Sequence, residues 1–120
     1  MTLGNLLLVG VGGFFGAITR FSVSQFINNR FTFNIPMATL IINLLGSFLL
    51  GLIFGLGLSQ PLLWLFGTGY LGAFTTFSTF KLEGVQLHLN NRKKEFYIYN
   101  GITYCGGITL AYLGFMMGQF

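Results

Sequence analysis

Ionisable side chains are scarce in this chain. Only 7% of its 120 residues are charged, and two of these, Glu83 and Glu95, are acidic. Soluble domains carry about 25% charged residues, so the composition excludes an ordinary soluble domain. The single His88 has no acidic or thiol neighbour at metal-ligand spacing. The sequence therefore lacks the constellation that an enzyme active site or a side-chain metal centre requires.

Cysteine is also nearly absent. Cys105 has no partner for an intrachain disulfide, and we expect it to be a small buried packing residue. The formal net charge of +4 comes from sparse basic residues without a domain to carry a phosphate-binding face. We therefore expect no nucleic-acid partner.

Apolar residues dominate what is there, at 53% of the chain with a mean hydropathy of +0.75. Four long apolar stretches cover residues 3–27, 37–58, 62–89 and 96–120. Each is long enough to cross roughly 30 Å of hydrocarbon as a helix. The first is too long for a signal-peptide core, so we expect it to stay as a mature span. We predict an all-α fold, a four-span bundle that forms one integral membrane domain over residues 1–120.

The connections between these stretches are short, at residues 28–36, 59–61 and 90–95. Arg30 and the run Arg92–Lys94 fall on the same side of a four-span chain, which predicts that this side is cytoplasmic and that both termini face out. Small residues spaced four apart predict close helix packing; they are Gly12 and Gly16, then Ser47, Gly51 and Gly55, and Gly114 with Gly118. No internal repeat is visible, so a two-fold pairing requires a second chain.

The third stretch contains the most unusual segment, Gly67–Phe80, which reads GTGYLGAFTTFSTF. Its Thr and Ser residues compete with helix through local side-chain hydrogen bonds. Non-helical backbone at membrane depth survives only where protein buries it or where it lines a polar cavity. The sequence therefore predicts a broken third helix, and the carbonyl groups freed at the break, beginning at Gly72 and Thr75, are hard oxygen ligands that suit a small cation.

Two other polar residues lie inside apolar stretches. Arg20 ends a run of small residues in the first stretch, and we favour a structural anchor over direct ion contact for it. Asn43 lies in the middle of the second stretch, where a buried amide can cap free carbonyl groups, donate to an anion or hold helices together.

Phe77 and Phe80 are three residues apart, which places them on one helix face if helix resumes after the break. In a chain with 15 phenylalanines such a pair is normally a packing pair. An aromatic ring has a positive edge, so rings turned edge-on can also accept a small anion without a charge that traps it.

Three motifs together resemble the Fluc/CrcB fluoride channels of bacteria and some eukaryotes: the segment Gly67–Phe80, the run GGFFGAITR at Gly12–Arg20 and the run NLLGSFLLG at Asn43–Gly51. The resemblance implies a channel that passively exports cytoplasmic fluoride and confers fluoride resistance. It also implies an antiparallel dimer in the lipid bilayer of the cell membrane.

The resemblance also implies roles for particular residues. The fluoride path would be formed by Asn43, Phe77, Ser78, Thr79, Phe80, Tyr99 and Thr103. A structural Na⁺ that is not transported would be held by Gly72 and Thr75, and Arg20 would serve architecture or vestibule charge. One departure is visible: after Tyr99 and Thr103 the same helix face continues with glycine, leucine and alanine instead of further hydroxyl groups.

Two alternatives remain. A small proton-coupled multidrug exporter has a similar length, but it needs an acid inside a membrane helix, and Glu83 and Glu95 are expected near the basic cytoplasmic end. A noncatalytic membrane partner subunit is the other. Because the Lys and Arg bias predicts one orientation, an antiparallel partner would be a separate homologous chain in preference to a second copy.

Overall fold

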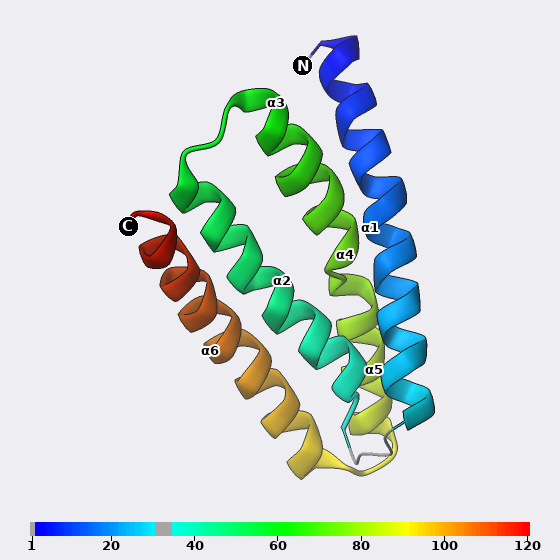
Figure 1. The fold of residues 1–120 in the computed structure, drawn as a ribbon. Helices are drawn as coiled ribbons and strands as arrows, with labels where there is room; N and C mark the ends of the chain where they lie inside the picture. The colour runs from blue at the N-terminus through cyan, green and yellow to red at the C-terminus, as the bar shows by residue number, and fades with distance from the viewer. Residues whose placement is uncertain (1, 31–34) are drawn as a thin grey trace.

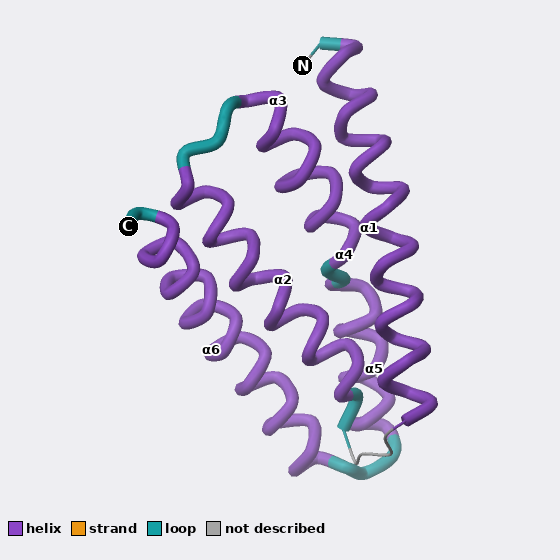
Figure 2. Tube along the Cα trace, viewed as in Figure 1, coloured by secondary structure: helices purple, strands orange, loops and turns teal. Residues whose placement is uncertain are grey.

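The computed structural model describes residues 2–30 and 35–120, and within these ranges the fold is all-helical (Figure 2). The all-α prediction is confirmed for this part of the chain. The elements are α1 (Leu3–Arg30), α2 (Met37–Leu56), α3 (Gln60–Leu62), the π-helix η1 (Leu63–Leu71), α4 (Gly72–Phe74), α5 (Phe77–Leu89) and α6 (Lys93–Gly118).

The helices lie along one another in an elongated bundle that measures 47 × 29 × 26 Å. Elements α3, η1 and α4 follow without interruption, and α5 continues their course after a short extended segment (Figure 1). Helix α2 packs most extensively on α6, and α1 packs most extensively on η1. Both chain termini lie at one end of the bundle, and the connection between α5 and α6 lies at the other (Figure 1).

Two of the described helices, α1 and α2, are long and apolar enough to cross a membrane. The remaining two predicted spans do not meet the same test as single helices. The third is divided among α3, η1, α4 and α5, while α6 begins with Lys93, Lys94 and Glu95 and carries further polar residues along its length.

Helix boundaries differ from the predicted stretches by a few residues. Helix α1 continues through Asn28 and Asn29 to Arg30, because polar residues end an apolar run without ending a helix. Residues 31–34 of the first predicted connection lie outside the described residues. Helix α2 ends at Leu56, since Gly57 adopts the left-handed conformation, at φ 70°, that closes many helices.

The predicted small-residue sets are confirmed as contact points between backbones. A Cβ atom at Gly12 or Gly16 would collide with carbonyl oxygens of η1, at Leu65 and Tyr70. The sets on α2 and α6 face each other in the same way: Gly51 packs on the carbonyl of Ala111, Gly55 on Phe115 and Gly114 on Phe48. These glycines let the helices approach more closely than side chains would permit.

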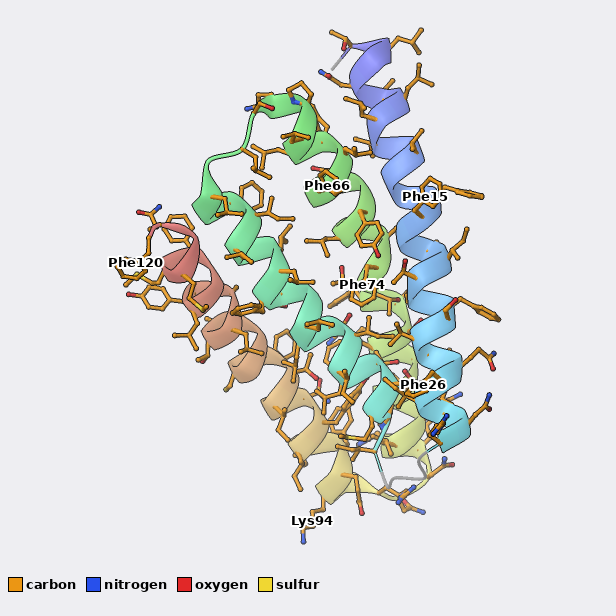
Figure 3. All side chains as sticks on the ribbon, in the orientation of Figure 1. Phe15, Phe26, Phe66, Phe74, Lys94 and Phe120 are labelled. Atoms are coloured by element: carbon orange, nitrogen blue, oxygen red, sulfur yellow. The ribbon has the colours of Figure 1, made fainter. Side chains whose placement is uncertain are left out.

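Two apolar clusters form the core. One joins Leu40, Phe80, Leu87 and Tyr99 across α2, α5 and α6, and the other joins Ile42, Leu71 and Phe74 across α2, η1 and α4. The outer surface is also apolar, and Phe15 and Phe120 extend from it in Figure 3. Cys105 lies on this outer surface, so the expectation that it is buried was wrong: its side of α6 faces away from the bundle.

Candidate functional site

The helical course between η1 and α5 is interrupted at Thr75 and Thr76. Both have extended backbone, with φ −78° and ψ 158° at Thr75 and φ −146° and ψ 115° at Thr76. Helix α5 begins at the next residue, Phe77, and Thr76 caps it, because its Oγ1 accepts a 3.3 Å hydrogen bond from the Thr79 N–H. The hydroxyl residues of this segment thus satisfy backbone groups that an interrupted helix leaves free.

The amide of Asn43 closes the interruption from the neighbouring helix α2. Its Oδ1 accepts from the Thr76 N–H at 2.9 Å, and its Nδ2 donates to the Thr76 carbonyl at 2.9 Å. The side chain therefore replaces the backbone acceptor that the Thr76 N–H would have in a continuous helix. The Thr76 carbonyl, which as the N-cap also accepts the first backbone bond of α5, gains a second donor. Of the three roles open to Asn43 from the sequence, the structure supports the capping role directly.

The hydrogen bonds made by Thr76 and Thr79 also determine which backbone carbonyl groups lack their usual helical N–H donor. The Thr76 N–H is directed to Asn43 and the Thr79 N–H to the Thr76 hydroxyl, so neither serves the carbonyl four residues earlier, at Gly72 and Thr75 respectively. The side-chain hydroxyl of Thr75 is itself occupied, since it donates to the Leu71 carbonyl at 3.0 Å. Gly72 is exposed and Thr75 half-buried on this chain.

A cavity of about 210 Å³ adjoins the interruption, between α2, α5 and α6. It brings together four residues of the predicted fluoride path, Asn43, Phe77, Phe80 and Thr103. Its other lining residues are Gly46, Ser47, Leu50, Thr75 and Tyr104. Side chains from three separate parts of the sequence therefore meet at one place, beside the break in the helix.

Phe77 and Phe80 lie on one face of α5, with ring centroids 6.1 Å apart, which confirms the spacing argument. Their surroundings differ. Phe80 is 2% exposed and packs on Tyr99 at 5.1 Å and Tyr104 at 5.5 Å, whereas Phe77 is 65% exposed. Phe80 thus forms the inner wall of the cavity and Phe77 its outer rim.

Helix α6 contributes two buried hydroxyl groups that have no hydrogen-bond partner in the described part of the chain, Tyr99 OH and Thr103 Oγ1. Thr103 lines the cavity, and Tyr99 lies behind the ring of Phe80. Buried hydroxyl groups without partners are rare in folded proteins. The Thr103 hydroxyl therefore marks this wall of the cavity as a place where a polar ligand or water would be favourable.

The small residues that follow Thr103 on α6 have a packing explanation. A Cβ atom at Gly107 would lie 3.4 Å from the Ser47 hydroxyl, and Gly106 packs on Leu44. The hydroxyl groups missing from this face of α6 therefore coincide with its contact to α2, and Ser47 of α2 supplies a hydroxyl to the cavity instead.

Five predicted site residues do not line the cavity within this chain: Ser78, Thr79, Tyr99, Arg20 and Gly72. Ser78 and Thr79 are exposed on α5 and do not line it. Arg20 is half-buried on α1, where the neighbouring Thr19 accepts a 2.8 Å hydrogen bond from the Tyr70 hydroxyl.

Several residues around the cavity were missed from the sequence. Thr76 is the capping partner of Asn43, and the spacing Thr76-x-x-Thr79 was the signal that could have identified it. Tyr104 lines the cavity, and the ammonium of Lys81 lies 5.6 Å from its ring centroid. No spacing pattern joins these two, because they belong to different helices.

A polar contact between α2 and α5 was also missed. Thr39 of α2 donates to the carboxylate of Glu83. Glu83 lies six residues before the end of α5 at Leu89, on the side of the bundle that leads to Arg92–Lys94. Its carboxylate therefore relies on a donor from the neighbouring helix.

Comparison with known proteins gives this geometry a family. The family model described as "CrcB-like protein, Camphor Resistance (CrcB)" matches residues 7–115. The chain is 51% identical over 112 residues to the fluoride-specific ion channel FluC 2 of a Bacillus cereus strain, covering 93% of this chain and 95% of that protein.

Two further relatives come from other genera. The fluoride-specific ion channel FluC 1 of Geobacillus kaustophilus is 46% identical over 113 residues, which cover 94% of this chain and 97% of the relative. FluC 1 of Listeria monocytogenes serovar 1/2a is 40% identical over 114 residues, with 95% and 97% covered. Identity of this level over almost the whole length shows that the chain belongs to the CrcB-like protein family.

Proposed function

We propose that this protein is a fluoride-selective ion channel that passively exports cytoplasmic fluoride. The observation that carries the proposal is the cavity where Phe77 and Phe80 meet Asn43 and Thr103, in a chain 51% identical to a protein named as a fluoride-specific ion channel. The relatives are named as channels and not as enzymes. The protein is accordingly a channel and not an enzyme.

The lining of the cavity suits a small, strongly hydrated anion. Fluoride loses hydration in an apolar passage, and that loss must be replaced by hydrogen-bond donors. The amide of Asn43 retains a second N–H, and the Thr103 hydroxyl, which has no partner in the described part of the chain, is close by. The Ser47 hydroxyl donates to the Asn43 carbonyl at 2.8 Å, so it is not a free donor. The rings of Phe77 and Phe80 add positively polarised edges.

Ser78 and Thr79 of α5 are also part of the proposed fluoride path. Ser78 and Thr79 do not line the cavity of this chain, but both are exposed on its surface. They are therefore able to contribute hydroxyl groups to a path that a second subunit completes.

The efflux of fluoride from loaded liposomes tests the function. Replacing Phe77 with isoleucine removes a ring edge worth about 1 kcal/mol, so efflux should fall roughly fivefold. Phe77 is the better probe because it is 65% exposed and Ile leaves the core intact, whereas Phe80 belongs to the core. The protein is purified from its native membrane with any partner retained.

Phe120→Ile is the matched control, because Phe120 is 99% exposed at the far end of the chain. Its efflux should equal that of the unmodified protein, and chloride efflux should stay low throughout. Absence of fluoride efflux from the unmodified protein, or equal fluoride and chloride efflux, would remove the proposed function.

The proposed arrangement in the membrane is a four-span bundle with a broken third helix, in the cell membrane, with both termini outside. The apolar outer surface and the two helices that are long enough to span a bilayer support it. Further support comes from the position of the termini at the end of the bundle opposite Lys94 (Figure 3). An antiparallel second subunit, a homologous chain in preference to a second copy, completes the path.

A structural Na⁺, held by backbone carbonyl groups of Gly72 and Thr75, belongs to the same proposal. Its support is the donor set: the N–H groups that would normally pair with these two carbonyl groups are bound elsewhere, and carbonyl oxygens are hard ligands for a small cation. Two carbonyl groups are too few for a full coordination shell, so the antiparallel subunit would supply the others. When bound, the ion would attract the carbonyl oxygens at the helix interruption of each subunit and so stabilise the contact between the two subunits.

Removing Na⁺ should lower the melting temperature of the assembled protein. A ligand at 100 times its Kd stabilises a folded protein by about 2.7 kcal/mol. Thermal unfolding is measured in NaCl and in N-methylglucamine chloride at equal ionic strength. Thr75→Val should keep the Na⁺ dependence, because it changes a side chain that is bonded to Leu71 and leaves the carbonyl in place. Equal melting temperatures in the two salts would rule out the ion.

A further inference from the structure

Lys81 places a positive charge against the aromatic rim of the cavity. Its Nζ lies 5.4 Å from the ring centroid of Phe77, 5.4 Å from that of Phe80 and 5.6 Å from that of Tyr104. These distances are within the range of cation–π attraction. All three rings line the cavity described above. The ammonium group is therefore held at the site by residues of two helices, α5 and α6.

The depth of Lys81 makes the contact significant. Lys81 lies four residues after the start of α5 and eight residues before its end at Leu89, which at 1.5 Å per residue is about 12 Å from the basic end of the bundle. A lysine side chain is too short to bring its ammonium to that end. Its partners in the described part of the chain are the aromatic rings of Phe77, Phe80 and Tyr104. A charge in that position is costly unless it faces a polar path or protein, and such charges are usually functional.

A cation over the face of an aromatic ring and an anion at its edge can both interact with that ring without contacting each other. A cation over the face of a ring draws electron density toward itself, so the hydrogen edge becomes more positive toward an anion. The ammonium of Lys81 lies over three rings that line the cavity, while Lys81 itself does not line it. It can thus attract an anion into the cavity without forming the close ion pair that would hold the anion there.

We propose that the positive charge of Lys81 concentrates anions at the cavity lined by Phe77, Phe80 and Tyr104 and thereby raises the rate at which anions enter the path. This inference rests on the proposed channel function and adds a fixed cation to it. From the sequence, ring edges and neutral side-chain hydrogen-bond donors were expected to serve the anion, without a positive charge. Charge focused in a low-dielectric cleft raises local ion concentration and entry rates.

Fluoride efflux at two ionic strengths tests the role of Lys81. At low ionic strength K81M should reduce the initial rate about tenfold, the lower limit for electrostatic focusing, and K81R should retain most of the rate. At about 1 M salt, where the Debye length is roughly 3 Å, the difference should shrink. Lys94→Met is the control, because Lys94 lies at the basic end, away from the cavity (Figure 3).

A second measurement separates this inference from the channel function. The melting temperature is compared in NaF and NaCl at constant Na⁺, and fluoride should raise it for the unmodified protein and K81R but not for K81M. This readout needs no conduction, so it decides the role of Lys81 even if the protein fails to conduct. An efflux rate for K81M that equals or exceeds the unmodified rate would overturn the proposal. So would a fluoride-dependent shift that is absent from the unmodified protein or unchanged in K81M.

Discussion

Replacing Asn43 by alanine should lower the free energy of unfolding by about 1–3 kcal/mol, because the buried Thr76 N–H loses its partner, while the Thr76 carbonyl keeps the first backbone hydrogen bond of α5. Both arms of the amide bond Thr76 at 2.9 Å, one to its N–H and one to its carbonyl oxygen. Alanine provides neither arm, and Thr76 is only 8% exposed, so water cannot easily take over within this chain. Thermal unfolding in detergent measures the loss.

Asn100→Ala is the matched control for this prediction. The Asn100 amide donates only to the carbonyl of Phe96 one turn earlier on its own helix, so its removal should change stability little. Fluoride efflux from Asn43→Ala should also fall, since Phe77 follows directly after Thr76 and the cavity wall shifts with it. Lost efflux with an unchanged melting temperature would contradict the capping role and assign Asn43 directly to the anion path.

The fold was largely predictable because its main elements depend on long apolar runs and on spacing. Runs of about 20 or more apolar residues predict helices whatever their neighbours are, and α1, α2 and α6 lie where such runs lie. The glycine sets also identified helix contacts, since a missing side chain at every fourth residue clears one helix face. Boundaries were less predictable, because Asn28 and Asn29 extend α1 through local backbone bonds that the apolar pattern does not record.

The candidate site was predictable in part. Asn43, Phe77, Phe80 and Thr103 were identified from the sequence and meet at one cavity. That Phe80 is buried while Phe77 is exposed depends on how α5 is rotated against α6, which spacing alone does not determine. The same rotation brings Lys81 to the ring of Tyr104, from a different helix.

The bond between Thr39 and Glu83 shows the same limit. It joins residues 44 positions apart on α2 and α5, so only the packing of these helices reveals it. It also explains how an acid is accommodated inside helix α5. A half-buried carboxylate is stabilised by a hydrogen-bond donor, and Thr39, which is 5% exposed, provides one.

The basic residues predict that a reporter fused after Phe120 will be active on one side of the membrane only. Arg30, Arg92, Lys93 and Lys94 belong to the end of the bundle opposite both termini. Lys and Arg near short connections remain in the cytoplasm. An alkaline phosphatase fusion should therefore be active outside the cell, and a green fluorescent protein fusion should remain dark.

A charge-shifted variant tests the cause of this orientation. Arg92, Lys93 and Lys94 are replaced by glutamine, and two lysines are inserted between Ser59 and Gln60, in the opposite connection. Because this change reduces the charge bias, both reporters should then give a signal. Equal signals from the unmodified chain, or no change in the variant, would contradict the charge argument.

A single orientation has a consequence for assembly. Two copies that insert the same way cannot form the proposed antiparallel pair, so under this proposal the second subunit would be another chain with the opposite bias. The face of α6 where hydroxyl groups are replaced by Gly106 and Gly107 fits such a pair, because a partner chain can supply a complete path of its own while this chain packs α6 tightly on α2. Fluoride efflux from this chain purified without any partner would show instead that two copies suffice.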